Sequence, residues 1–127
     1  MRRYNITNRN ESLAIDIYDW CKKHKLWGDC TIYFDGIALS SSKEWDLELG
    51  KKIDKDLYQY ENKNPLDCFE YANPDTLSMS FEGPLYHVLN GYVRGGYKLE
   101  EQLQKLFKKY GYYFEYGHAW NLSAYEL

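Results

Sequence analysis

The sequence predicts an α+β domain in which helices cover one face of an antiparallel sheet. Two amphipathic helical patterns lie near the ends of the chain, at about residues 10–26 and 98–110, and several short apolar or alternating runs lie between them. These runs predict four to seven strands, and the βαβα alternation of a doubly wound parallel sheet is absent. No linker or low-complexity stretch divides the 127 residues, so we expect a single domain over residues 1–127.

The first predicted helix carries its apolar residues on one stripe. Within ESLAIDIYDWCKKHKLWG, the positions i, i+4, i+7, i+8 and i+11 are Leu13, Ile17, Trp20, Cys21 and His24. This spacing is one face of a helix with 3.6 residues per turn. The segment then continues with CTIYF, Asp35-Gly36 and IALS. Because an Asp-Gly pair between two apolar runs is a strong turn signal, this segment predicts a β-hairpin.

The C-terminal segment repeats the order of helix, glycine and hairpin. The same helical spacing is found at Leu99, Leu103, Leu106, Phe107 and Tyr110. Gly111 ends this helix, and YYFEYGHAWNLSAYE predicts a hairpin or one bent strand. If a three-residue loop or a bulge joins its two parts, the even positions from Tyr112 to Trp120 share one face. We expect that face to be a wall of the core, which leaves Tyr113, with His118 beside the turn, for contact.

The middle of the chain provides further strands and two short helices. EWDLEL (44–49) alternates strictly, Gly50 with two lysines suggests a turn, and DLYQYE (56–61) is the expected partner strand. TLSMSFE (76–82) predicts another strand. Prolines at first helical positions predict short helices near 65–71 and 84–90.

Residue types that support catalysis or metal binding occur without a matching pattern. The histidines His24, His87 and His118 show neither HxxxH nor HExxH spacing. The cysteines Cys21, Cys30 and Cys68 contain no CxxC pair. We therefore predict no catalytic residue, no metal site and no cofactor. A small enzyme that uses His118 with Glu115 is the least favoured alternative.

The cellular location is predicted from what the chain lacks. The N-terminus MRRYNITNRN has no apolar signal region, and no apolar run reaches the length of a membrane span. We expect a soluble, cytoplasmic protein with reduced thiols and no contact with a membrane.

Acidic residues concentrate in the middle of the chain, although the net charge is only −3. Residues 35–82 hold 11 Asp and Glu against 5 Lys, whereas the flanks together hold 8 acidic and 11 basic residues. Such a surface favours a partner with a basic groove, although a solvated strand face without function is the plain alternative. The predicted interaction residues are Glu44, Asp46, Glu48, Asp54, Asp56, Tyr58, Tyr60, Glu61 and Tyr113.

Nucleic-acid or nucleotide binding is the alternative function. The helix at 98–110 is basic, with Lys105, Lys108 and Lys109 beside exposed tyrosines that could stack on bases. The sequence pI of about 5.6 argues against a dedicated binder, because phosphate contacts supply most non-specific affinity.

Small size, high Tyr and Asn content and the lack of a catalytic motif resemble accessory proteins of phages and mobile elements, and the composition is similar to that of anti-CRISPR proteins. EWD (44–46), TLSMSFEGP and YYFEYGHAWNLSAYE resemble the ferredoxin-like domain of phage and plasmid proteins over roughly residues 44–127. The usual paired prolines of that domain are here the single Pro84. The resemblance implies a non-enzymatic protein that binds and inhibits a host protein, such as a CRISPR or other defence nuclease.

Overall fold

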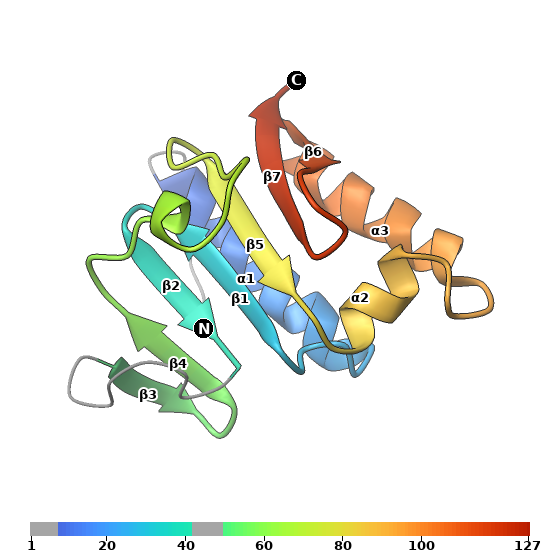
Figure 1. Cartoon of the computed structure of the whole chain (residues 1–127), viewed down its shortest axis with the longest axis horizontal. Coiled ribbons are helices and arrows are strands. Elements are labelled where there is room, and N and C mark those ends of the chain that lie inside the picture. The colour runs from blue at the N-terminus through green and yellow to red at the C-terminus, as the bar shows by residue number, and fades with distance from the viewer. Residues whose placement is uncertain (1–7, 42–49) are drawn as a thin grey trace.

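The computed structural model describes residues 8–41 and 50–127, which form one antiparallel sheet with helices packed against it (Figure 1). Across the sheet the strand order is β3-β4-β2-β1-β5-β7-β6. The strands in these ranges are β1 (Cys30–Phe34), β2 (Ile37–Ser40), β3 (Gly50–Asp54), β4 (Leu57–Tyr60), β5 (Leu77–Phe81), β6 (Tyr112–Tyr116) and β7 (Asn121–Glu126). The predicted α+β architecture is confirmed.

The helices lie close to their predicted positions. They are α1 (Arg9–Lys23), α2 (Pro84–Leu89) and α3 (Gly96–Lys109), with a 3₁₀ turn, η2 (Pro65–Asp67). The helical structure near 65–71 is therefore shorter than expected. α1 and α3 each lead through a short link into an antiparallel hairpin, β1–β2 and β6–β7 respectively. The repeated plan of helix and hairpin is confirmed.

The β1–β2 turn forms where the Asp-Gly pair predicts it. Asp35 and Gly36 have φ angles of 50° and 77°, and the flanking Phe34 and Ile37 pair directly. Positive φ at both central positions matches the right-handed twist of the strands, and Gly36 adopts it without steric cost.

The main core lies between the sheet and the helices. Inward residues of the central strands, among them Ile32, Met79 and Leu122, pack in one cluster with Leu13 of α1 and Phe107 of α3. All five side chains are fully buried. Burial of each such side chain contributes about 1.5–3 kcal/mol relative to exposure. This face fixes the positions of α1 and α3.

A second, smaller cluster lies on the opposite face of the sheet. Its buried members are Tyr33, Ala38, Tyr58, Tyr60 and Phe69. Phe69 comes from the connection between β4 and β5, and its ring lies 5.6 Å from those of Tyr33 and Trp120. The connection thus covers part of the sheet that the helices leave open.

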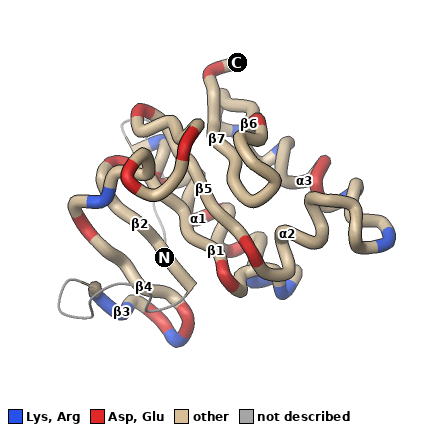
Figure 2. The backbone as a smooth tube through the Cα atoms, viewed as in Figure 1, with Lys and Arg blue, Asp and Glu red and all other residues tan. Residues whose placement is uncertain are grey.

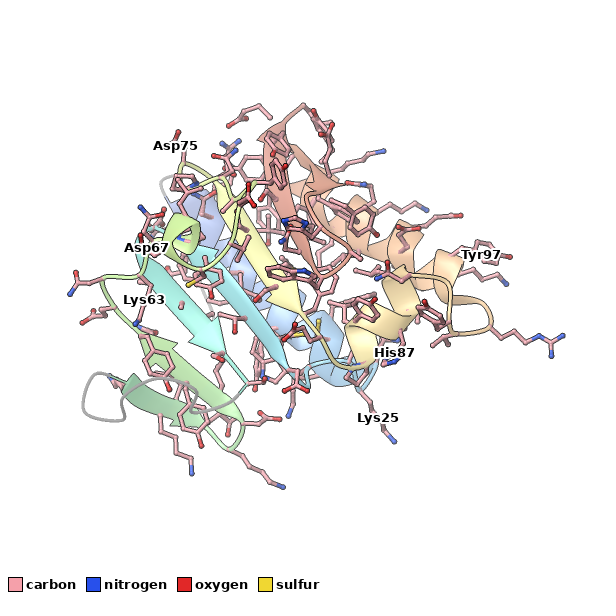
Figure 3. All side chains as sticks on the ribbon, viewed as in Figure 1. Lys25, Lys63, Asp67, Asp75, His87 and Tyr97 are labelled. Carbon is pink, nitrogen blue, oxygen red and sulfur yellow. The ribbon has the colours of Figure 1, made fainter. Side chains whose placement is uncertain are left out.

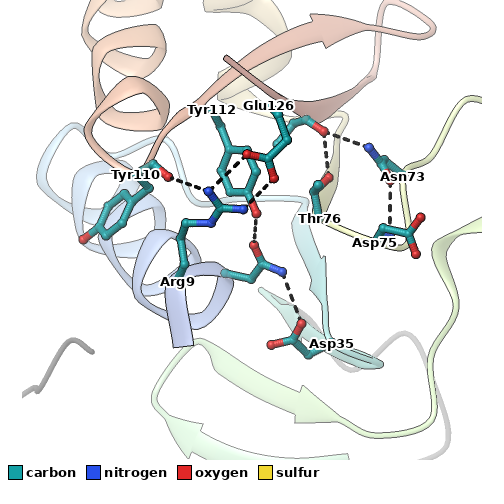
Figure 4. A network of polar contacts seen from close by, with 10 residues as sticks. Arg9, Asp35, Asn73, Asp75, Thr76, Tyr110, Tyr112 and Glu126 are labelled. Atoms are coloured by element: carbon teal, nitrogen blue, oxygen red, sulfur yellow. Dashed lines mark hydrogen bonds and ion pairs between the residues drawn. The ribbon is translucent and has the colours of Figure 1, made fainter. Parts of the chain in front are cut away.

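Polar contacts join the first turn of α1 to the end of the chain (Figure 4). Arg9 pairs with Glu126 at 2.6 Å, and its guanidinium lies 4.1 Å from the centre of the Tyr112 ring. The Tyr112 hydroxyl donates to Asn10 at 2.5 Å. Residues more than a hundred positions apart are therefore held together at the β6–β7 edge of the fold.

The middle of the chain pairs differently from the prediction. Gly50 and the two lysines after it form β3, and the turn falls at Lys55 and Asp56 instead. Gly50 lies against the ring of Tyr60, where an added Cβ would come within 2.3 Å of a ring carbon. The glycine therefore allows close packing within a strand, and the expected turn at Gly50 is wrong. The expected strand at 44–49 lies outside the described residues.

The aromatic run near the C-terminus divides between the two faces. Tyr112 and Phe114 are in the main core, as predicted from parity. Residues 117–120 form a four-residue loop between β6 and β7, so parity does not continue through it. Trp120 packs against the second cluster, which makes the expectation that it shares the face of Phe114 wrong.

Candidate interaction surface

β3 and β4 extend the sheet to one side of α1 (Figure 1). Side chains of α1, β2, β3 and β4 line a groove there. Its volume is about 380 Å³. It is lined by Ile15, Tyr18, Asp19, Leu39, Ile53, Asp54 and Leu57. We name it the α1–β4 groove.

The floor and one wall of the groove are apolar. Leu39 of β2 and Leu57 of β4 are buried at the bottom, and Ile15 of α1 is half-buried. Ile53 on the edge strand β3 is 46% exposed. An exposed Ile beside an apolar floor provides a contact point for an apolar side chain from another molecule.

Two carboxylates, those of Asp19 and Asp54, line the groove beside this apolar floor, and Asp56 lies next to it in the turn. Asp19 comes from α1, and Asp54 and Asp56 come from the end of the β3–β4 hairpin. The Tyr18 hydroxyl donates to Asp56 at 3.2 Å. Burial, followed by the negative charges of Asp56, Asp54 and Asp19, raises the pKa of Tyr18 to about 12. The described lining of the groove therefore combines apolar side chains with two carboxylates and contains no lysine or arginine.

The hairpin end is anchored to the C-terminal half of α1. Lys22 pairs with the Asp56 carboxylate, and this contact is the main reason that the pKa of Asp56 is lowered. The Trp27 indole donates to the backbone carbonyl of Asp56 at 2.8 Å, and its ring meets that of Tyr18 edge-on at 4.9 Å. The shape of the groove is thus set by contacts within the chain, before any partner binds.

Acidic and basic residues are mixed along the β3–β4 hairpin (Figure 2). Residues 50–61 contain three lysines beside three acidic residues. The larger described surplus lies in residues 61–82, which hold five acidic residues and one lysine. Four of these five acidic residues lie on the connection from β4 to β5, away from the groove, and Glu82 follows β5.

The predicted interaction residues do not form one surface. Asp54 and Asp56 lie at the groove, whereas Glu61 follows the opposite end of β4. Tyr113 lies on β6, at the other edge of the sheet from β3. Glu44, Asp46 and Glu48 lie outside the described residues.

The two tyrosines of β4 are the clearest correction. Tyr58 is 9% exposed and Tyr60 is fully buried, and both belong to the second cluster. The prediction that they contribute to an exposed acidic-aromatic surface is wrong. Their alternation with Leu57 and Gln59 showed that they share a face, but that face is covered by the connection that carries Phe69.

Sequence reasoning missed the part of the groove that α1 supplies. The predicted stripe included Trp20 and His24, yet the helix buries Ala14 and Tyr18, while Trp20 and His24 are half-buried. The buried face is therefore rotated toward β4. The available signal was Ile15 with Tyr18 three residues later, which are neighbours on a helix surface.

The basic helix of the alternative function is exposed along one side. Lys98, Lys105 and Lys108 of α3 are exposed. Lys109 instead pairs with Asp16 at 3.1 Å, and the Tyr110 hydroxyl donates to the same carboxylate. The exposed tyrosine on this helix is Tyr97, in its first turn.

Cys21, Cys30 and His118 each pack against other side chains of the chain. Cys21 and Cys30 are buried, and the contact between their thiols together with burial raises the pKa of Cys21, which disfavours a reactive thiolate. The His118 ring lies 5.2 Å from Tyr71 and 5.4 Å from Trp120. Over residues 8–41 and 50–127, no three His, Cys, Asp or Glu side chains are placed to hold a metal ion.

In the described part of the chain, none of the helices combines the length and apolar character needed to cross a membrane. Comparison of the chain with protein-family models, with curated proteins and with solved structures found no match. These comparisons therefore supply no function by similarity.

Proposed function

We propose that this protein is a non-enzymatic interaction protein whose α1–β4 groove receives a basic segment of a partner protein. The observation that carries the proposal is that Asp19 and Asp54 line a groove with an apolar floor, with Ile53 exposed at its edge. An apolar side chain flanked by lysine or arginine would match both the floor and the rim. Complementary charge increases the association rate and the selectivity for such a partner.

Preorganisation of the groove supports binding. Because Asp56 is already held by Lys22 and Tyr18, a partner does not have to order the β3–β4 turn. Binding energy is therefore not lost to loop ordering at this point, which is a substantial cost in many interfaces.

A nucleic-acid-binding effector is the partner class that fits this chemistry. Proteins that bind nucleic acids present lysine and arginine to phosphates, and an acidic rim can occupy such a surface in competition with the nucleic acid. We propose that the partner is a host protein of this kind, such as a CRISPR or other defence nuclease, and that binding inhibits it.

The test begins with affinity capture of the partner from cells of the native host, followed by calorimetric titration of the purified pair. Asp19→Lys reverses the charge of the rim, and we expect about tenfold weaker binding. Ile53→Thr keeps a β-branched residue in the strand but removes apolar surface, and should also weaken binding. Asp75→Lys, the matched control, makes the same charge change on the exposed connection to β5, and should leave the affinity unchanged. Equal affinity for all three variants and the unmodified protein would contradict the proposal.

Single-stranded nucleic acid is the second candidate, on a different surface. The exposed lysines of α3 follow Tyr92 and Tyr97 along the chain. These two tyrosines are exposed near the start of the helix. Aromatic side chains beside lysines can stack on bases while the lysines contact phosphates. A salt-dependent mobility shift with a single-stranded oligonucleotide, lost in Lys105→Glu, would favour this candidate over the groove.

A further inference from the structure

A second hollow lies beside α2 and shares no lining residue with the α1–β4 groove. Its volume is about 330 Å³ and it is lined by Glu82, Tyr86, His87 and Trp120. We name it the α2–Trp120 pocket. Glu82 follows β5, Tyr86 and His87 lie on α2, and Trp120 lies at the end of the β6–β7 loop (Figures 1 and 3).

Contacts within the chain hold the aromatic walls in place. The Trp120 ring stacks on His118 at 5.4 Å with an interplanar angle of 8°, and meets Phe69 edge-on at 5.6 Å. The Tyr86 ring is nearly parallel to Tyr92, 6.3 Å away. Both walls are therefore supported by a second ring.

Hydrogen bonds to backbone carbonyls hold the Trp120 loop at a fixed position relative to α2, which carries Tyr86. The backbone N–H of Phe81 donates to the carbonyl of Trp120 at 2.8 Å. The side-chain amide of Asn90, the residue after α2, donates to the carbonyl of Ala119 at 2.9 Å and to that of Tyr86 at 2.9 Å. The loop that carries Trp120 is thus attached both to β5 and to the end of α2.

The imidazole and the charged group of the pocket both offer hydrogen-bond acceptors. His87 Nδ1 lies 3.0 Å from the carbonyl oxygen of Gly83. Because a carbonyl can only accept, Nδ1 carries the hydrogen, and in the neutral ring Nε2 is then an acceptor. Glu82 is exposed, and its carboxylate forms no hydrogen bond or ion pair with the described residues. Within residues 8–41 and 50–127, no lysine or arginine lines the pocket.

A ligand that matches this pocket donates hydrogen bonds, carries positive charge and packs against the aromatic side chains of Tyr86 and Trp120. The arginine guanidinium has these three properties, since it is planar, has five N–H donors and has no acceptor. Its attraction to a tyrosine or tryptophan face adds to the charge interaction with Glu82. Phosphate does not fit, because the Glu82 carboxylate repels it and the described lining residues supply no lysine or arginine.

We propose that the α2–Trp120 pocket binds an arginine side chain of a protein partner. The proposal rests on the pocket alone and does not depend on the function of the α1–β4 groove. A partner could engage either site without the other.

The test uses small probes and two-dimensional NMR of the full chain. Nα-acetyl-L-arginine methylamide should shift the signals of the Trp120 indole and of residues 82–92, whereas the neutral citrulline analogue should not. Glu82→Gln removes the charge with little change in shape, and should weaken arginine binding roughly fivefold. Glu101→Gln, the same exchange at an exposed position of α3, should have no effect.

Three results would overturn the proposal. The first is the absence of any shift up to the solubility limit of the arginine probe. The second is equal binding of the lysine analogue, which would remove the role of the planar guanidinium. The third is a shift of the same signals by adenosine monophosphate but not by arginine, which would indicate a site for nucleobases.

Discussion

Asp56 links the stability of the hairpin end to the shape of the α1–β4 groove. Its carboxylate accepts from Lys22 and from the Tyr18 hydroxyl, and its backbone carbonyl accepts from Trp27. One turn residue therefore contacts three side chains of the N-terminal region. Because Lys22 and Asp56 are both partly exposed, the ion pair itself contributes modestly.

Replacement of Asp56 by asparagine should lower the free energy of unfolding by less than about 1 kcal/mol at neutral pH. The folded-state pKa of Asp56 is lowered below its ordinary value of 3.8, chiefly by Lys22. The stabilisation is therefore full above that value and is lost as the pH falls through the lower folded-state pKa. Urea denaturation at a series of pH values checks this prediction. A difference between the two proteins that grows as the pH falls below the ordinary value would contradict it.

At the scale of elements, a side chain of α3 forms hydrogen bonds with the backbone of the edge strand β6. The backbone N–H of Phe114 donates to Gln104 Oε1 at 2.7 Å, and Gln104 Nε2 donates to the Phe114 carbonyl at 3.3 Å. The amide thus takes the place of a neighbouring strand. An open edge is a site for pairing with another chain, so this contact protects the sheet from self-association.

Gln104→Ala should lower the free energy of unfolding by about 1–2 kcal/mol, because the backbone N–H and C=O of Phe114 lose their hydrogen-bond partner. We also expect concentration-dependent self-association, measured by light scattering alongside urea denaturation. Lys105→Ala, a neighbouring exposed position of the same helix, is the matched control and should change neither quantity. Equal behaviour of the two variants would show that Gln104 does not close the edge.

β3 and β4 can pack closely at Gly50 because glycine has no Cβ. An added Cβ would overlap the Tyr60 ring, which is fully buried and cannot move away freely. Gly50→Ala should therefore destabilise the protein by about 1–3 kcal/mol, the usual cost of overpacking. Thermal unfolding of this variant and of Lys51→Ala, an exposed residue of the same strand, gives the comparison. A Gly50→Ala protein as stable as the control would refute the proposed packing.

At the scale of the whole molecule, local patterns predicted most of the helices and strands, with β3 as an exception, but not the surface. The Asp35-Gly36 turn and the stripe that contains Leu103 and Phe107 depend on neighbouring residues only, so their signals are complete in short windows of sequence. The α1–β4 groove joins Ile15 to Ile53, from segments far apart along the chain. Such a juxtaposition depends on strand order, which no local pattern specifies.

Local sequence patterns also did not predict which aromatic residues are exposed. Alternation places Tyr58 and Tyr60 on one face of β4, but their burial depends on Phe69 from a connection without regular strand structure. Trp120 packs against the same cluster on the second face of the sheet, and its side chain also lines the α2–Trp120 pocket. Two-sided covering of the sheet is therefore the feature that decides which tyrosines are free for contact.

Hydrogen–deuterium exchange of the complex with the captured partner tests the central claim most directly, because it locates the binding surface without a mutation. If the α1–β4 groove is the interaction surface, the partner should slow exchange in residues 15–19 of α1 and 53–57 of the β3–β4 hairpin, and should leave α3 unchanged. Slowed exchange confined to α3, or to the connection at 61–76, would contradict the assignment of the groove.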